Sequence, residues 1–166
     1  ATWHGKAYGS FGRFACQSFH ETKNLSSGEG GAIVVNDPDA VEAVEKLREK
    51  GTDRSKFFRG QVDKYTWVSP GSSFLLGEIP AAMLAAGLAD WDVTQAARHR
   101  AWDRYAEGLT GFATRTGSHL QPALPGNAHP AHLFYLLAPT ASDRDSMLAH
   151  CRSRDVLAVS HYQPLA

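Results

Sequence analysis

Residues 18–35, with the sequence SFHETKNLSSGEGGAIVV, decide the fold of this chain. A single lysine, Lys23, stands between a short polar run and the Gly-Glu-Gly-Gly turn of residues 28–31. The turn leads into an apolar, β-branched run that ends with Val34 and Val35, which is typical of a strand opened by glycines. We therefore expect a loop that carries one lysine and continues directly into a strand.

The neighbouring segments predict a second strand and a helix. Residues 12–19 alternate small, aromatic and polar side chains, as a short strand does. Asp37 is a favourable N-cap and Pro38 suits the first helical position, so we expect a helix over residues 38–51. Strands and helices mixed along the chain in this way indicate an α/β protein.

The middle of the chain joins a polar-aromatic segment to an apolar helix. Residues 52–74 have no clear period, and an irregular loop of this length inside a compact protein is usually functional or an arm. Residues 75–109 predict one long helix, with Pro80 close enough to its start to be tolerated.

Composition changes after Gly108, where a proline-containing, loop-rich stretch begins. The pattern beyond it predicts a buried strand, a helix and a final strand, at residues 132–139, 142–155 and 156–162. Ser142 and Asp145 form a capping-box pattern at the start of that helix. We therefore expect a domain boundary near Gly108, which separates residues 1–108 from residues 109–166.

The bulk properties exclude several classes of partner. The 166 residues include 17 basic and 17 acidic side chains, and this balance argues against nucleic acid or a polybasic membrane contact. The longest apolar run is too short to cross a bilayer, and the start has no signal-peptide pattern. We expect a cytoplasmic protein with no nucleic-acid and no membrane partner.

Cysteine and histidine show no metal-type spacing, so we expect no metal site. Two free thiols in a reducing compartment are the favoured interpretation of Cys16 and Cys151, with a disulfide between them as the alternative. The chain starts with Ala1 and its two methionines are internal, which we interpret as a fragment of a longer translation product.

Lys23 has two chemical interpretations. A lysine that attacks a carbonyl group must lose its proton near neutral pH, which requires a partly desolvated, preorganised pocket. Hydroxyls and loop amides beside it could bind a phosphate, and the hydroxyls belong to Ser18, Thr22, Ser26 and Ser27. The alternative is a solvated lysine in a serine-rich turn, which composition alone favours.

The run around Lys23 resembles the pyridoxal-phosphate lysine segment of the DegT/DnrJ/EryC1/StrS family of sugar aminotransferases. The family pattern is Ser-Phe, three variable residues, Lys-Asn, and then a Gly-Glu-Gly-Gly turn and a strand. Residues 18–35 match it with Lys23-Asn24 in place. Residues 48–74, which include FFRGQVDKYTW, resemble the branch that makes dTDP-4-amino-4,6-dideoxygalactose. The resemblance covers nearly the whole chain and is thinnest over residues 108–130.

The resemblance implies roles at the cofactor. Lys23 would hold pyridoxal 5'-phosphate and move the proton between substrate and cofactor carbons, with Asn24 beside it in the cofactor site. Ser18 would bind the cofactor phosphate. Ser73 lies where many relatives carry an asparagine that reaches the phosphate of a neighbouring subunit. A subset of the family has histidine in place of the lysine and catalyses dehydration, so Lys23 argues for transamination.

The resemblance also implies substrate contacts. Arg59, Lys64 and Tyr65 would lie in a loop that approaches the nucleotide sugar across a homodimer, since arginine and lysine suit a diphosphate. His161 would line the sugar pocket. The alternative for each of these residues is an ordinary surface contact. His20 is expected either to support the residues of the site or to be solvated, rather than to act in catalysis.

The resemblance implies a partial fold-type-I architecture like that of aspartate aminotransferase. Residues 1–108 would form the C-terminal part of the large cofactor domain with the connecting helix, and residues 109–166 would begin the small domain. The reaction would move the amino group of L-glutamate to a dTDP-4-keto-6-deoxyhexose.

The family's aspartate for the pyridine nitrogen would precede residue 1. We therefore expect the chain by itself to be inactive. The resemblance also implies that other strands of the same sheet lie outside this chain, so we expect exposed apolar surface. Two alternatives stay open, which are another nucleotide keto-sugar as substrate and a non-catalytic assembly module.

Overall fold

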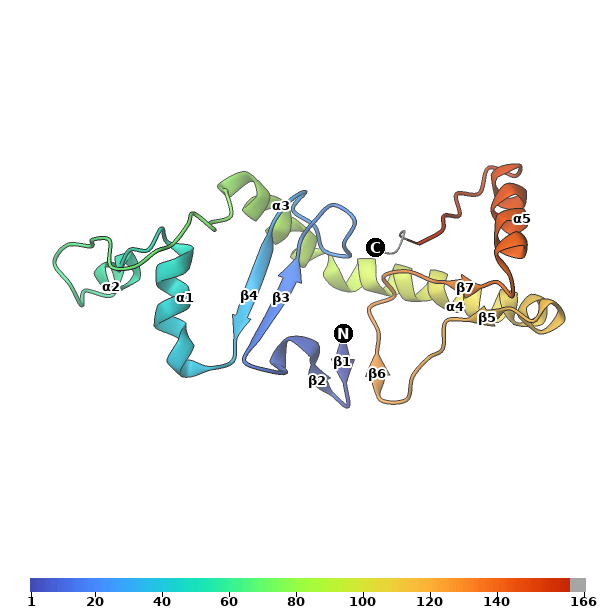
Figure 1. Cartoon of the computed structure of the whole chain (residues 1–166), viewed down its shortest axis with the longest axis horizontal. Helices are drawn as coiled ribbons and strands as arrows, with labels where there is room; N and C mark the ends of the chain where they lie inside the picture. The colour runs from blue at the N-terminus through green and yellow to red at the C-terminus, as the bar shows by residue number, and fades with distance from the viewer. Residues whose placement is uncertain (162–166) are drawn as a thin grey trace. The chain divides into compact units, whose positions relative to one another are not determined.

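The computed structural model describes residues 1–161, which belong to two compact units (Figure 1). The first unit comprises Ala1–Gln95 with Pro125–His132, and the second comprises Ala96–Leu124 with the described part of Leu133–Ala166. These units reflect contacts within this chain. The assignment of residues 1–108 and 109–166 to two domains of a larger fold stays a prediction.

An antiparallel hairpin forms the centre of the first unit. Strand β3 (Phe14–Ser18) pairs with β4 (Gly31–Val35) over five residues each, so that Ser18 lies opposite Gly31 at the loop end. Both predicted strands are confirmed. The pairing places the lysine-bearing residues 19–30 in the connection between the two strands, as Figure 1 shows.

A second, three-stranded sheet ties the start of the chain to a distant segment. Its order is β2 (Lys6–Ala7), β1 (Thr2–Trp3) and β6 (Asn127–Ala128), with antiparallel pairing throughout. The short 3-10 helix η1 (Tyr8–Ser10) follows β2. This sheet explains why residues 125–132 belong to the first unit.

The predicted helix after β4 is confirmed, together with its N-cap. The 3-10 turn η2 (Pro38–Ala40) leads into α1 (Val41–Arg48), and a carboxylate oxygen of Asp37 accepts a hydrogen bond from the amide of Asp39 at 3.0 Å. Arg13 donates to the same carboxylate at 2.6 Å, and this guanidinium holds the pKa of Asp37 below its usual range.

Residues 52–74 contain a helix, so the prediction of an entirely irregular loop is wrong. Helix α2 (Arg54–Phe58) forms early in this segment, which we call the aromatic arm. Isolated bridges join Glu49 to Ser73 and Thr52 to Trp67, and they bring the two ends of the arm back to the end of α1.

The predicted single helix over residues 75–109 is two helices. Helix α3 (Glu78–Ala89) ends at Asp90, a residue type that competes for backbone hydrogen bonds and favours helix ends. Helix α4 (Trp91–Thr116) continues past residue 109, where we expected the helix to end. Pro80 lies in the first turn of α3, as expected.

The second unit contains a cluster of aromatic side chains from α4 and from residue 134. Trp102, which is 8% exposed, packs edge-on against Phe134 at 5.4 Å between ring centroids, and Tyr105 stacks on the same ring at 5.6 Å. Strands β5 (His119–Leu120) and β7 (Leu136–Leu137) form an antiparallel pair in the same unit.

The later elements differ from the predicted ones. The buried strand expected at residues 132–139 shrinks to two residues, and no strand forms over residues 156–161. Helix α5 (Ala141–Arg152) starts one residue earlier than expected, because Thr140 caps it by accepting a hydrogen bond from the amide of Asp143 at 3.1 Å. The capping box predicted at Ser142 is therefore wrong.

Exposed apolar surface is confirmed for the described residues. Buried apolar side chains are few, namely Phe19, Trp102, Ala113 and Ala131. Large apolar side chains face solvent instead, among them Trp67 at 76% and Ile79 at 78% exposed. None of the helices in residues 1–161 has the length and hydropathy needed to span a membrane.

Candidate active site

The connection between β3 and β4, residues 19–30, is held closed by its own backbone, and we call it the lysine loop. The amide of Phe19 donates to the carbonyl of Gly30 at 2.8 Å, and the amide of Ser27 donates to the carbonyl of Phe19 at 2.9 Å. A turn in the middle bonds the amide of Lys23 to the carbonyl of His20 at 2.9 Å. Lys23 therefore stands on a turn with a defined backbone.

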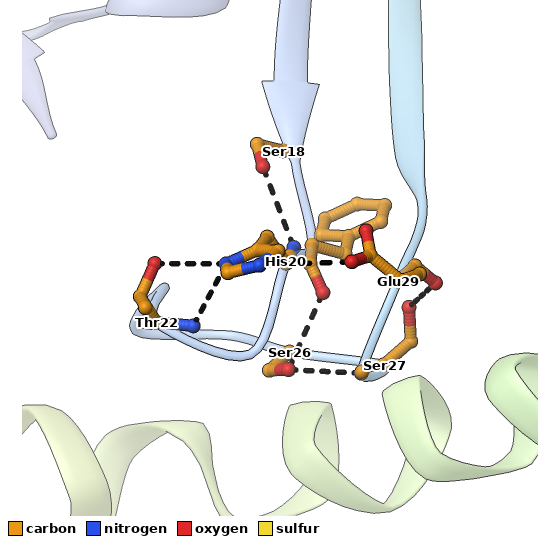
Figure 2. A network of polar contacts seen from close by, with 8 residues as sticks. Ser18, His20, Thr22, Ser26, Ser27 and Glu29 are labelled. Atoms are coloured by element: carbon orange, nitrogen blue, oxygen red, sulfur yellow. Dashed lines mark hydrogen bonds and ion pairs between the residues drawn. The ribbon is translucent and has the colours of Figure 1, made fainter.

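The side chain of His20 stabilises that turn through contacts inside the lysine loop (Figure 2). Its Nδ1 accepts a hydrogen bond from the amide of Thr22 at 3.3 Å and contacts the Thr22 hydroxyl at 3.0 Å. Neutral His20 therefore carries its proton on Nε2, which faces a Glu29 carboxylate oxygen at 3.6 Å. These contacts fit the supporting role expected for His20.

The serines after Lys23 are committed to the loop itself. Ser26 Oγ donates to the carbonyl of Phe19 at 3.3 Å and accepts from the amide of Gly28 at 3.0 Å. Ser27, which is 3% exposed, donates to the carbonyl of Glu29 at 2.8 Å (Figure 2). A hydroxyl has one hydrogen to donate, so neither serine has a donor left for a phosphate, contrary to our expectation.

Ser18 is in a different position at the end of β3. Its side chain is exposed, and its Oγ accepts a hydrogen bond from the amide of His20 at 3.4 Å (Figure 2). Accepting leaves the hydroxyl hydrogen available to donate outward. Of the four hydroxyls near Lys23, that of Ser18 is thus suited to donate to an external anion.

Steric constraints explain the glycines at residues 30 and 31 of the Gly-Glu-Gly-Gly turn. Gly30 has φ +148°, and a Cβ there would lie 2.8 Å from Leu76 Cδ1 and 2.9 Å from Ser27 Oγ. A Cβ at Gly31 would lie 2.8 Å from the carbonyl oxygen of Gln17. Glycine at these positions lets the lysine loop close tightly onto the hairpin and onto Leu76.

Lys23 itself is exposed, and among residues 1–161 its ammonium group has no ion-pair partner. The next residue is anchored instead. Asn24 Nδ2 donates to Gln95 Oε1 at 3.2 Å and to the carbonyl of Pro130 at 2.6 Å, while its Oδ1 lies 2.6 Å from His132 Nδ1. Sequence reasoning missed these partners, which lie 71 to 108 positions away along the chain.

The predicted substrate residues lie on the aromatic arm, where Arg59 is already paired. Its guanidinium binds both carboxylate oxygens of Glu45 at 2.8 and 2.9 Å, which lowers the pKa of Glu45 and raises that of Arg59. Beside this pair, Lys46 and Lys56 bind Glu42 at 2.6 and 2.8 Å, and their hydrogen bonds lower the pKa of Glu42 to about 2.

Stacking orders the rest of the arm. The guanidinium of Arg54 lies 5.0 Å from the ring centroid of Phe58 and 5.9 Å from that of Tyr65. Lys64 is exposed and forms no ion pair with the described residues. Ser73 bridges to Glu49 at the end of α1.

No hydrogen bond or ion pair within residues 1–161 joins the aromatic arm to the lysine loop. His161 is exposed in the second unit, where its carbonyl accepts a hydrogen bond from Ser160 Oγ at 3.4 Å. The structure thus brings Ser18, Lys23 and Asn24 onto one hairpin and leaves the other predicted site residues on separate segments. Within the described residues, no three histidine, cysteine or acidic side chains gather in a way that could hold a metal ion.

Relatives of known activity match most of the chain. The dTDP-3-amino-3,4,6-trideoxy-alpha-D-glucose transaminase of Streptomyces venezuelae is 29% identical over 163 residues, which are 98% of this chain and 39% of the relative. GDP-perosamine synthase of Caulobacter vibrioides is 33% identical over 137 residues, covering 82% of this chain and 33% of the relative. The chain therefore spans between a third and two fifths of the length of these relatives.

Solved structures share the fold. The crystal structure of S. venezuelae DesV in complex with a ketimine intermediate superposes with a TM-score of 0.80 at 29% identity, covering 97% of this chain and 40% of that one. AtS13 from Actinomadura melliaura, at 21% identity, superposes with a TM-score of 0.82 and supports the fold alone. These matches confirm a partial α/β architecture of fold type I. Since the model of the DegT/DnrJ/EryC1/StrS aminotransferase family matches residues 1–166, the chain belongs to that family.

Proposed function

We propose that this chain supplies the lysine-bearing half of a pyridoxal-phosphate site in an aminotransferase for nucleotide keto-sugars. One observation carries the proposal. Lys23 is exposed on a closed loop whose other polar side chains mostly bond within the loop or to its anchors, and that loop lies in a chain matched by the aminotransferase family model.

The residues present fit the lysine and phosphate ends of the cofactor. Lys23 Nζ would hold its carbonyl carbon, and the hydroxyl of Ser18 would donate to its phosphate. When bound, pyridoxal phosphate supplies the electron sink that makes a proton on the amino-bearing carbon removable. Lys23 Nζ would take that proton and return it at the neighbouring carbon.

For the substrate, we propose a dTDP-4-keto-6-deoxyhexose that accepts the amino group of L-glutamate and becomes dTDP-4-amino-4,6-dideoxygalactose. Support comes from the resemblance of residues 48–74 and from the exposure of Lys64 and Tyr65. Arg59 would have to leave Glu45 before it could clamp a diphosphate, since its fork is already occupied.

The proposed site also draws on a second copy of the chain. Ser73, Lys64 and Tyr65 would reach the active site of the partner in a homodimer, because no polar contact joins the aromatic arm to the lysine loop of the same chain among the described residues. His161 would close the sugar side. We propose a cytoplasmic enzyme, in keeping with its soluble nucleotide-sugar substrates.

A different nucleotide keto-sugar is the second candidate, and a specific observation favours it. The matched relatives carry names for a dTDP-3-amino sugar and for a GDP sugar rather than for the 4-amino galactose product. A non-catalytic assembly module is the third candidate, favoured by the large apolar side chains exposed on the chain.

Amino transfer from glutamate distinguishes these candidates. The protein as encoded by its gene would be loaded with pyridoxal phosphate and given glutamate with dTDP-4-keto, dTDP-3-keto or GDP-4-keto sugars. The 2-oxoglutarate released beyond one equivalent per active site would be measured, because that excess requires a sugar that accepts the amino group. We expect release with the dTDP-4-keto sugar and none from Lys23→Arg. Release with another sugar alone would favour the second candidate, and none with any sugar would overturn the enzyme proposal.

A further inference from the structure

The side chain of Asn24 joins the lysine loop to two other parts of the first unit. Its two amide hydrogens go to Gln95 Oε1 at 3.2 Å and to the carbonyl of Pro130 at 2.6 Å. Its Oδ1 lies 2.6 Å from His132 Nδ1, and since a carbonyl oxygen only accepts, that nitrogen is the donor. Gln95 Nε2 also donates to the carbonyl of Pro130 at 3.1 Å, which closes the network.

These contacts use nearly all of the hydrogen-bonding capacity of Asn24. A primary amide has two donors and two acceptor lone pairs. Both donors and one lone pair are occupied within the chain, and the side chain is half-buried. Little remains with which Asn24 could bind a cofactor directly.

The partners of Asn24 lie at the edges of the first unit. Gln95 is the last residue of that unit in α4, and His132 is the last residue of its second segment. The chain therefore leaves the first unit directly after each of these two residues. The side chain of Asn24 therefore joins the lysine loop to both residues after which the chain leaves the first unit, Gln95 and His132.

The turn that Asn24 grips is held in an unfavourable conformation. Ala131 has φ +46°, in the left-handed region that residues other than glycine rarely adopt. It is 6% exposed, and its amide donates to His129 Nδ1 at 3.1 Å. A residue persists in this region when its surroundings over-determine it. Two hydrogen bonds to the carbonyl of Pro130, from Asn24 and from Gln95, are part of that constraint.

We propose that Asn24 is a positioning residue for Lys23, which acts by fixing the lysine loop to Gln95 and to the turn of residues 129–132. The proposal rests on the proposed function of Lys23 and replaces direct cofactor binding as the role of Asn24. Since Lys23 is the adjacent residue, loss of the Asn24 amide removes the contacts that fix the position of Lys23 relative to Gln95 and to residues 129–132. A misplacement of about 1 Å at a reacting group can cost about a hundredfold in rate.

The test measures how fast the amine of Lys23 captures pyridoxal phosphate. The protein as encoded by its gene would be mixed with the cofactor, quenched with borohydride at set times, and mapped by peptide mass. Asn24→Ala removes the three contacts of the network that involve Asn24, and Gln95→Met removes the Gln95 anchor without changing a neighbour of Lys23. We expect each variant to capture cofactor on Lys23 about tenfold more slowly.

A double variant and a spectrum separate positioning from general loss of stability. If Asn24 acts through Gln95, the Asn24→Ala/Gln95→Met double variant should be no slower than Asn24→Ala alone, because the contact between Asn24 and Gln95 is already lost in that single variant. The absorbance of the bound cofactor would also be followed as a function of pH. The midpoint of this titration should shift in the same direction in all three variants. A merely structural role would leave that midpoint unchanged.

Asn36 supplies the matched control. Its Nδ2 donates to the carbonyls of Gly9 and Gly12 at 3.0 and 3.2 Å, so it is also an asparagine that grips backbone carbonyls in the first unit. It follows β4, at the end of the hairpin away from the lysine loop. Asn36→Ala should lower stability and leave both the capture rate and the absorbance midpoint at Lys23 unchanged.

Each outcome has one meaning. Slower capture and a shifted midpoint in Asn24→Ala and Gln95→Met, with Asn36→Ala unchanged, would support the positioning role. If the wild-type protein captures cofactor on Lys23 and Asn24→Ala has the same capture rate and absorbance midpoint, the positioning role is overturned and the proposed function stands. Failure of the wild-type protein to capture cofactor on Lys23 would overturn the proposed function and the positioning role together.

Discussion

The lysine loop and the aromatic arm both carry predicted site residues, and they are stabilised in different ways. The loop is closed by backbone hydrogen bonds, and Asn24 anchors it to residues far away along the chain. The arm is held by ion pairs to α1, by stacking around Arg54, and by the bridges at its two ends. Backbone contacts hold a fixed geometry, whereas exposed ion pairs exchange at little cost. The difference suits a cofactor lysine in the loop and substrate contacts that rearrange in the arm.

The largest expected effect comes from Gly51→Ala, which should break the attachment of the arm. Gly51 has φ +75°, and a Cβ there would lie 1.8 Å from the carbonyl oxygen of Ser69, so backbone has to move. We expect a loss of about 3 kcal/mol or more in the free energy of unfolding, or release of the arm. Urea denaturation and amide hydrogen exchange over residues 66–74 measure the two effects.

Gly60→Ala is the control for that prediction. Gly60 has a similar φ of +68°, but nothing lies within 4 Å of a Cβ built there. Only the backbone strain applies, which costs about 1 kcal/mol. Equal losses from Gly51→Ala and Gly60→Ala would contradict the claim that close backbone contact holds the arm to α1.

Gly30→Ala tests the closure of the lysine loop in the same manner. The added methyl group would meet a side-chain carbon of Leu76 and the hydroxyl of Ser27, so we expect a loss of about 2 kcal/mol. Gly28, with φ +80° and nothing within 4 Å of an added Cβ, is its control. A Gly28→Ala variant as unstable as Gly30→Ala would show that steric closure is not what holds the loop.

A smaller effect is expected from Arg59→Lys, which replaces the two-pronged contact with Glu45 by a single one. The Arg59 side chain is 46% exposed, and exposed ion pairs contribute about 1 kcal/mol or less. We expect a stability loss below about 1 kcal/mol that disappears in high salt, since salt screens exposed charges. A loss that persists at high salt would mean that packing, rather than charge, ties Arg59 to α1.

The smallest effect concerns pH and Glu42. Hydrogen bonds from Lys46 and Lys56 lower its pKa from the ordinary 4.5 to about 2. Because the pKa of Glu42 is lower in the folded chain than in the unfolded chain, its ionised carboxylate adds to the free energy of unfolding. This contribution is complete above pH 4.5 and is lost as the pH falls through about 2. NMR titration of the Glu42 carboxyl should give the low midpoint, and Lys56→Met should raise it. An ordinary midpoint in the wild-type chain would contradict this arrangement of charges.

Features with local causes could be predicted from the sequence. The hairpin strands follow from their own alternation and glycines, and the N-cap at Asp37 follows from two adjacent residues. The break at Asp90 was missed because the apolar pattern continues through it from α3 to α4. The strand predicted at residues 156–162 was wrong over its described part because a strand needs a pairing partner, and none of the described residues supplies one.

The residues of the candidate site also separate into those with local sequence signals and those that depend on distant partners. Lys23 and Ser18 could be proposed as site residues because the motif that contains them is contiguous, and the comparisons confirm the family to which that motif points. The anchoring of Asn24 could not be predicted, since its three partners are brought together only by the fold. Likewise, nothing in residues 52–74 indicates that Glu45 already occupies the guanidinium of Arg59.

The most direct test of the central claim compares one lysine of the loop with one of the arm. Lys23 and Lys64 are both exposed, and neither forms an ion pair with the described residues. The protein as encoded by its gene would be treated with pyridoxal phosphate and borohydride and mapped by peptide mass, with the two lysines quantified together. We predict modification of Lys23 at about one cofactor per chain while Lys64 stays unmodified. Equal modification of Lys23 and Lys64 would contradict the claim that the lysine loop is built to present a cofactor lysine.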